Sequence, residues 1–242
     1  MNTFSSLDHV RIILSHTSHP GNIGAAARAM KTMGLSSLYL INPKTFPDKE
    51  ADVRAVSARD ILEKIRVCTA LDEALDNTVL TAAMTARPRD LSHDVFNARQ
   101  GARELLRYAR QHPVALLFGA ETSGLTTAEV SKCQMIIHIP ANPEFTSLNL
   151  ASAVQVMAYE LRMALTENET EPVPLAEFPA SFNELELLYA HLERVMIASD
   201  FLDPQKPKLL MQRIRRLFGR ARLEKEEVQI LRGILTALGK RW

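Results

Sequence analysis

Short apolar runs alternate with amphipathic helical patterns from the start of the chain to about residue 165. Helical patterns cover residues 23–33, 102–111 and 148–165. Strands that alternate with helices pair in parallel and are covered on both faces, so this order predicts an α/β fold built on a parallel sheet. The run at 114–118 is wholly apolar, as expected for a central strand. The predicted strands are residues 10–14, 38–41, 65–68, 79–83, 114–118 and 135–139.

The pattern changes after residue 165. Residues 166–180 contain four Glu, three Pro and no basic residue, and residues 182–202, 207–223 and 224–242 have helical patterns. From residue 201 onward there are eleven Lys and Arg against four Asp and Glu. We therefore expect a domain at 1–165, an acidic linker at 166–180 and a small all-α extension at 181–242. The basic face of that extension is either simply solvated or, as we expect, binds a polyanion such as a nucleic acid.

Composition narrows the class of protein. Hydrophobic residues make up 46% of the 242 residues and charged residues 24%, as in soluble globular proteins. No apolar run approaches the ~20 residues that span a bilayer, and the first residues lack the pattern of a secretory signal. Cys68 and Cys133 are far apart in the chain. We expect two buried free thiols in a protein of the reducing cytoplasm.

The first strand leads into "HTSHPGNIGAAARAM" and then a helix. A dinucleotide-binding turn would need a glycine where His19 stands and an acid near Asn42, so this pattern argues against a nicotinamide-dependent oxidoreductase. Arg28 is better explained as a ligand for an RNA phosphate, and Asn22 as a cap of the helix or a donor to the same backbone. A capping Asn and a solvated Arg remain the alternative.

Two later segments also have residues expected at a ligand-binding site. In "LLFGAETSGLT" two glycines surround Glu121 at the end of a strand, which lets the chain pass close to a ligand. In "IHIPANPEFTSLNLASAV" a strand reaches a loop that opens a long helix. Thr146 or Ser147 is the expected N-cap of that helix. Asn149, in its first turn, is expected to point back at the loop because Asn is unfavourable inside helices.

These three segments, in order across about residues 8–165, resemble the SPOUT superfamily of methyltransferases. The resemblance is to the SpoU/TrmH-like branch and, within it, to the bacterial TrmJ type, whose basic helical extension the chain also shares. The matching positions are Asn22, Gly24 and Arg28; Phe118, Gly119, Glu121, Gly124 and Leu125; and Ile139, Pro140, Ser147, Leu148 and Asn149.

The resemblance implies a SPOUT fold with a C-terminal trefoil knot that binds S-adenosylmethionine. It also implies a homodimer with helix 148–165 in its interface, and methylation of the ribose 2′-hydroxyl of cytidine or uridine at position 32 in the tRNA anticodon loop. Another tRNA or rRNA site, or a non-catalytic RNA-binding homologue, is the alternative. The cofactor-binding residues would be Met84, Thr85, Ala86, Gly119, Ile139, Thr146, Ser147 and Leu148.

By the same resemblance, Asn22 and Asn149 would position the ribose and Arg28, while Glu121 would hold Arg28 or Asn22. A guanidinium is too weak an acid to serve as the base, so we expect Arg28 to clamp the phosphate and stabilise the alkoxide. The proton would leave through that phosphate or through Ser147. We expect no metal, because His16 and His19 lack a third ligand. Residues expected to bind RNA are His19, Arg87, Arg89, Arg213, Arg215, Arg216, Arg220 and Arg222.

Overall fold

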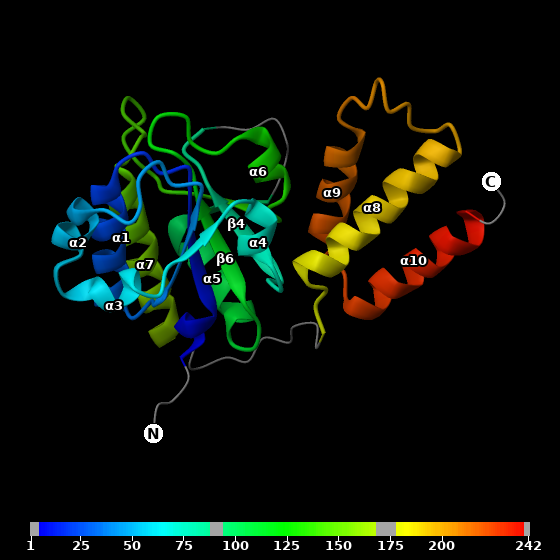
Figure 1. The fold of residues 1–242 in the computed structure, drawn as a ribbon. Coiled ribbons are helices and arrows are strands. Elements are labelled where there is room, and N and C mark those ends of the chain that lie inside the picture. Colours follow the sequence, from blue (N-terminus) through cyan, green and yellow to red (C-terminus); the bar gives the residue numbers. More distant parts are fainter. Residues whose placement is uncertain (1–4, 88–93, 168–177, 240–242) are drawn as a thin grey trace.

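A seven-stranded parallel sheet forms the centre of the protein in the computed structural model (Figure 1), which describes residues 5–87, 94–167 and 178–239. The strand order is β3-β2-β1-β6-β4-β7-β5, and every pairing is parallel. The α/β prediction is therefore confirmed. The strands are β1 (Val10–Ser15), β2 (Ser37–Ile41), β3 (Arg66–Cys68), β4 (Leu80–Met84), β5 (Asp94–Asn97), β6 (Val114–Phe118) and β7 (Met135–His138).

Six of these strands overlap the predicted ones to within two residues at each end, and β5 was missed. Its four residues pair only with β7 at the edge of the sheet, and Val95 in its middle is exposed. An edge strand of this kind needs no apolar run, so its sequence carries no strand signal. The central position of β6 is confirmed: it lies between β1 and β4, and all five residues are buried.

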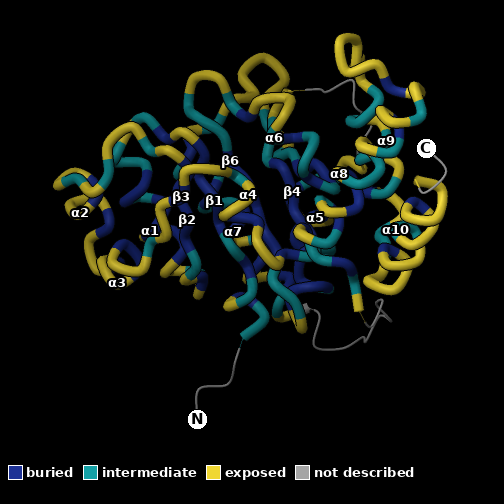
Figure 2. The backbone as a smooth tube through the Cα atoms, turned by 45° about the vertical axis from the view of Figure 1, so that its right-hand side comes forward, coloured by how far each residue is buried: buried dark blue, intermediate teal, exposed yellow. Residues whose placement is uncertain are grey.

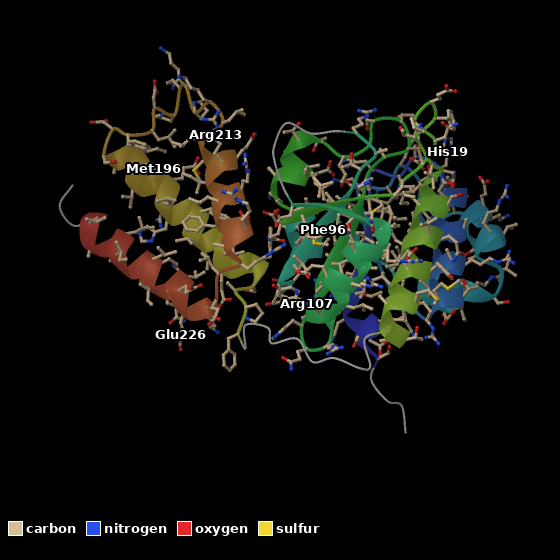
Figure 3. The ribbon with its side chains drawn as sticks, turned by 180° about the vertical axis from the view of Figure 1, so that it is seen from behind. His19, Phe96, Arg107, Met196, Arg213 and Glu226 are labelled. Carbon is tan, nitrogen blue, oxygen red and sulfur yellow. The ribbon has the colours of Figure 1, made fainter. Side chains whose placement is uncertain are left out.

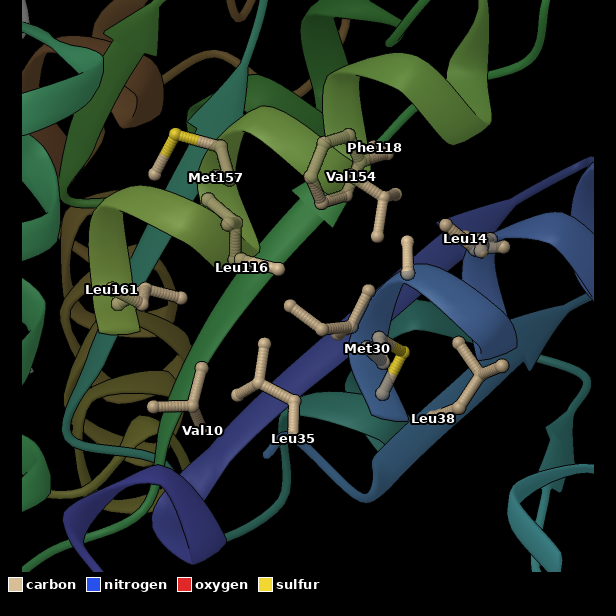
Figure 4. Close-up of a cluster of buried hydrophobic side chains, with 14 of the residues drawn as sticks. Val10, Leu14, Met30, Leu35, Leu38, Leu116, Phe118, Val154, Met157 and Leu161 are labelled. Atoms are coloured by element: carbon tan, nitrogen blue, oxygen red, sulfur yellow. The ribbon is translucent and has the colours of Figure 1, made fainter. Parts of the chain in front are cut away.

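Helices cover both faces of the sheet. On one face α7 lies between α1 and α5, and their apolar sides form the largest core together with β1, β6 and β4. Figure 4 shows this core, with Leu116 and Phe118 of β6 against Met157 and Leu161 of α7. The other face packs on α4 and α6. The α-helices of this part are α1 (Pro20–Met33), α2 (Lys49–Ala55), α3 (Arg59–Leu62), α4 (Leu71–Leu75), α5 (Ala98–Ala109), α6 (Thr127–Ser131) and α7 (Leu150–Glu167), and short 3-10 helices span Ser6–His9 and Val56–Ala58.

The regular elements described after residue 178 are all helical, as predicted: α8 (Phe182–Ala198), α9 (Leu210–Ala221) and α10 (Lys225–Gly239). They enclose a small core of their own, which includes Leu188, Tyr189 and Val228, and they lie beside the sheet (Figure 1). Phe182, the first residue of α8, is instead buried in the core between the sheet and α6. The boundaries at 165 and 181 stay predictions, as does the trefoil knot.

Burial follows the layers of the fold. Figure 2 shows the sheet strands mostly buried and the outer turns of the helices exposed. Cys68 and Cys133 are buried free thiols, as expected. Burial raises the pKa of both thiols, so neither is a ready nucleophile at neutral pH. None of the described helices is long and apolar enough to cross a membrane.

Candidate active site

The carboxyl ends of parallel strands meet at one edge of a sheet, and ligands of such folds bind there. In this protein the loops after β4, β6 and β7 and the start of α7 enclose a cavity of about 220 Å³. Phe118, Leu125 and Leu150 give it an apolar wall, and Glu121 and Arg87 bring charge to it. All eight residues named from the sequence as cofactor-binding line this cavity.

The turn after β6 forms one wall and requires its two glycines. A Cβ on Gly119 would lie 2.2 Å from the carbonyl carbon of Gly124, so the two backbone segments touch only because Gly119 has no side chain. Gly124 has φ +67°, which L side chains rarely adopt, and its amide donates to the Ala120 carbonyl at 2.8 Å. This tight turn presents Glu121 to the loop that follows β1.

Glu121 joins that loop to α1. Its Oε2 accepts hydrogen bonds from the amide (2.9 Å) and hydroxyl (2.8 Å) of Ser18, and its Oε1 accepts from Asn22 Nδ2 (2.8 Å) and the His19 amide (3.3 Å). Partial burial alone would raise the pKa of this carboxyl, but the bonds from Ser18 and Asn22 outweigh it and lower the pKa to about 2. Glu121 is therefore ionised at every physiological pH.

Asn149 links α7 to the same network. Its Nδ2 donates to Asn22 Oδ1 at 3.0 Å, while its Oδ1 accepts from the amides of Ala151 (3.0 Å) and Ser152 (3.3 Å). The prediction that Thr146 or Ser147 caps this helix is wrong: α7 begins at Leu150, and the Asn149 side chain satisfies its first amides. Thr146 and Ser147 are exposed residues of the cavity wall instead.

Asn22 does not cap α1, contrary to one of the expected roles. The N-cap position is His19, which makes no side-chain cap, and Asn22 lies within the first turn with its amide group turned to Glu121 and Asn149. Of the two partners expected for Glu121, the structure thus selects Asn22. Gly24 also has a packing role, because a Cβ there would lie 2.0 Å from the Ala51 carbonyl oxygen of α2.

Arg28 is exposed and does not line the cavity. It follows Asn22 by six residues, which is about 240° around a helix, so the two side chains leave α1 in different directions. Within the described residues it makes no hydrogen bond or ion pair. The expected contact between Glu121 and Arg28 is absent from this part of the chain, and the guanidinium is free to bind a group from outside the subunit.

Two family models match the chain: "SpoU rRNA Methylase family" over residues 9–159, and "tRNA methyltransferase TrmJ, C-terminal domain" over residues 183–242. The chain belongs to the SpoU methylase family. It is 47% identical to the tRNA (cytidine/uridine/adenosine-2′-O-)-methyltransferase TrmJ of Pseudomonas aeruginosa, over 97% of this chain and 95% of the relative. It is 44% identical to the tRNA (cytidine/uridine-2′-O-)-methyltransferase TrmJ of Yersinia pestis, over 97% and 93%.

A solved structure supports the same family. The crystal structure of TrmJ from Z. mobilis ZM4 is 33% identical, has a TM-score of 0.84, and is matched over 94% of this chain and 98% of that one. The agreement extends through the helical extension, since coverage of this extent includes both parts of the chain. The SpoU methylase fold and its C-terminal helices are therefore present together in this protein.

The residues expected to bind RNA fall into different surroundings. His19 is exposed beside the site (Figure 3), and Arg87 is exposed and lines the cavity. Arg89 lies outside the described residues. In the extension, Arg213 and Arg220 are exposed, whereas Arg216 and Arg222 are half-buried.

The structure differs from the expectation that Arg215 of the basic helix binds RNA. Its guanidinium forms a bidentate pair with Glu186 and lies 4.5 Å from the ring centre of Tyr189. The side chain is only 19% exposed, so it is committed to holding α9 against α8. Arg215 is mostly buried because α9 packs one of its faces on α8, and the helical period places position 215 on that face.

Sequence reasoning missed Ser18, which makes two of the hydrogen bonds that fix Glu121. The nearest available signal was its place in "HTSHPGN", between the first strand and Asn22. Among the described residues, no group of three or more His, Cys, Asp and Glu side chains is arranged to hold a metal ion.

Proposed function

We propose that the protein methylates the ribose 2′-hydroxyl of the pyrimidine at position 32 in the tRNA anticodon loop, with S-adenosylmethionine as the methyl donor. One observation carries the proposal: three segments distant in sequence meet in the Glu121–Asn22–Asn149 network beside the cavity. The names of the TrmJ relatives support the reaction and the tRNA substrate. Position 32 rests on the resemblance to the TrmJ type.

The cavity suits such a donor. Apolar walls and backbone groups exposed by the glycine turn match a molecule with an adenine ring and a flexible polar chain. Gly119, Ile139 and Leu148 would hold it, with Met84–Ala86 closing the pocket. When bound, S-adenosylmethionine supplies an electrophilic methyl group on a sulfonium sulfur. The protein then has to align the ribose oxygen, which removes translational entropy from the reaction.

Asn22 and Asn149 are the residues we assign to the ribose. Each side-chain amide has two N–H donors, and the network uses one on each residue, which leaves one free N–H on each. Ionised Glu121 accepts only, so it fixes which way the Asn22 amide faces. Two donors in fixed positions can hold ribose or phosphate oxygens without further reorganisation.

Arg28 would bind the phosphate beside the target and stabilise the alkoxide that forms. Because it does not line the cavity of its own subunit, it would do so at the site of the second copy in a homodimer. Its guanidinium cannot act as a base near neutral pH, but its planar fork binds a phosphate through two hydrogen bonds. The proton would leave through that phosphate or through Ser147, whose exposed side chain lines the cavity.

Arg28→Lys keeps the positive charge and loses the planar guanidinium, so we expect a large fall in kcat. Near-full turnover by this variant would contradict the role of Arg28 as a phosphate clamp.

A homodimer completes the proposal. Tyr159 (46% exposed) and Met163 (37%) lie one turn apart on the outer side of α7, on the helix that begins after Asn149. A second copy packed on this face would cover both apolar side chains. The domain at 1–165 would perform the chemistry, and the extension at 181–242 would bind the tRNA body.

The deciding experiment uses purified protein, labelled S-adenosylmethionine and tRNA that lacks the modification. After transfer, digestion and mass spectrometry identify the methylated nucleoside and its position, with tRNAs carrying C, U or A at position 32 compared. A 2′-O-methylated nucleoside at position 32, lost in Arg28→Ala, is the expected result. A methylated base, or a label at another position or only in rRNA, would overturn the substrate assignment. No transfer with tRNA still bound would favour a non-catalytic RNA-binding protein.

A further inference from the structure

A closed turn lies between β7 and α7, directly before the wall of the cavity. The amide of Phe145 donates to the Asn142 carbonyl at 2.9 Å, and the amide of Glu144 donates to Asn142 Oδ1 at 3.0 Å. Residues 142 and 145 also form an isolated antiparallel bridge. Pro143 restricts the backbone between them. The position of Phe145 is therefore set by the turn and not by packing of its ring.

The ring of Phe145 is held out to solvent. It is 76% exposed, the highest value among the large hydrophobic side chains of the described residues. A single exposed apolar residue is common on a protein surface, but this one adjoins Thr146, Ser147 and Leu148, which line the cavity. The Asn149–Asn22 bond also brings the start of α1, with exposed His19, to the same rim.

The groups around the Phe145 ring indicate which part of an RNA would bind to it. An aromatic face presented in a fixed position is the feature by which proteins bind unstacked bases of RNA loops. The exposed Glu144 carboxylate next to it would repel a phosphate, so the nucleic-acid backbone is a poor occupant of this spot. Stacking tolerates different bases, which suits an enzyme that accepts both cytidine and uridine.

We propose that Phe145 stacks on the base of the target nucleotide and so holds its ribose at the cavity. This inference rests on the proposed function, because it assumes that an RNA loop enters this site. The attached ribose then lies between the turn and the two free amide N–H groups of Asn22 and Asn149. Phe145 is thus a positioning residue for the substrate.

The test compares Phe145→Ala, Phe145→Leu and Phe145→Tyr with the unchanged protein. We expect the KM for tRNA to rise about 5- to 150-fold in the Ala variant, the range that corresponds to one base–aromatic stack. The Leu variant should be similarly impaired, because it keeps apolar volume without an aromatic face, and the Tyr variant should be restored. The Kd for S-adenosylmethionine should not change. The matched control is Phe178→Ala, which removes an exposed ring at the base of the extension.

A second readout does not depend on turnover. An anticodon stem-loop with a fluorescent cytidine analogue at the target position should be quenched by the unchanged protein and by Phe145→Tyr, but not by Phe145→Ala. Equal quenching by the Ala variant, or none by any protein, would overturn the inference. A dimer lost on Phe145→Ala in light scattering would also overturn it, since the ring would then contact a second subunit. Absence of methyl transfer by the unchanged protein, with quenching intact, would count against the proposed function alone.

Discussion

Glu121 shows how much of a site one side chain can hold together. It is the acceptor for two residues of the loop after β1 and for the first turn of α1, and through Asn22 it reaches α7. A carboxylate is suited to this position because it only accepts hydrogen bonds, and all its neighbours here donate. Replacing one carboxylate oxygen by an NH2 group, which donates hydrogen bonds to neighbours that also donate, therefore breaks the network.

Glu121→Gln should reduce kcat/KM for tRNA about 100-fold, because the donors that position the ribose lose their support. The free energy of unfolding should fall by about 1–3 kcal/mol at pH 7, the usual cost of unpaired groups. Steady-state kinetics and urea unfolding measure the two effects. Glu144→Gln, a change of the same kind at an exposed turn residue, serves as the control for stability. Unfolding energies that match for both variants would contradict the role assigned to Glu121.

The pH dependence of that stability follows from the lowered pKa of Glu121. Because its folded pKa of about 2 lies below its ordinary value of 4.5, its contribution to folding is complete above pH 4.5. It declines as the pH falls toward 2. The difference in unfolding free energy between the unchanged protein and Glu121→Gln should therefore be constant from pH 7 to 5 and shrink below pH 4.5. A difference that grows in acid would show that the carboxylate does not carry it.

At the scale of elements, the position of α1 depends on a glycine that resembles part of a phosphate-binding turn. Gly24 lies where α1 and α2 touch, and a Cβ on Gly24 would meet the backbone oxygen of Ala51 before any other atom. Backbone atoms cannot turn aside as a flexible side chain can. The same close approach sets the start of α1, and with it Asn22, relative to the sheet.

Gly24→Ala should destabilise the protein by about 1–3 kcal/mol, since the two helices must separate. Gly233→Ala is the matched change: Gly233 lies exposed within α10 and has no neighbour within 4 Å of a Cβ. At position 233, alanine should raise the free energy of unfolding by about 0.5–1 kcal/mol, because its helix propensity is higher than that of glycine. Thermal and urea unfolding of the two variants test the pair. Equal effects would mean that propensity, and not the contact with α2, decides at position 24.

At the scale of the whole molecule, the extension is joined to the sheet domain through side chains that a charge count cannot identify. Phe182 is buried against the sheet, its amide donates to the Thr78 carbonyl at 2.7 Å, and Lys132 lies over its ring at 5.9 Å. Within the extension, Arg215 holds α9 to α8 through Glu186. Exposed Arg213 and Arg220 remain available for a partner.

Arg215→Ala should lower the free energy of unfolding, because it leaves the half-buried Glu186 without its partner. Arg213→Ala and Arg220→Ala should change that energy by less than about 0.5 kcal/mol. Each should instead weaken tRNA binding and reduce the slope of log Kd against log salt concentration by about 1. Binding titrations at several salt concentrations separate the two classes. If Arg215→Ala reduced the salt dependence of tRNA binding without lowering the free energy of unfolding, Arg215 would be an RNA-binding residue and not a structural one.

Local sequence was sufficient for six of the seven strands, the parallel sheet and the helical extension, whereas the residues of the cavity wall came from the resemblance to the SPOUT superfamily. Strand and helix periodicity depend on near neighbours, and the glycine turn after β6 is required by its own backbone geometry. The edge strand β5 escaped because an exposed, four-residue strand needs no apolar pattern. Thr146, Ser147 and Asn149 are all common N-cap residue types, so the choice of Asn149 depends on where α7 begins.

Tertiary structure alone decided which side chains meet. Glu121 and Asn22 are 99 positions apart and Asn22 and Asn149 are 127 apart, so their pairing depends on the sheet that brings three loops to one edge. The direction of Arg28, the packing role of Gly24 and the internal pairing of Arg215 follow from which helix face is buried. Sequence periodicity determines that one face of a helix is apolar, but long-range packing determines which element that face contacts. This packing leaves Arg28 exposed and places Glu121 at the centre of the site.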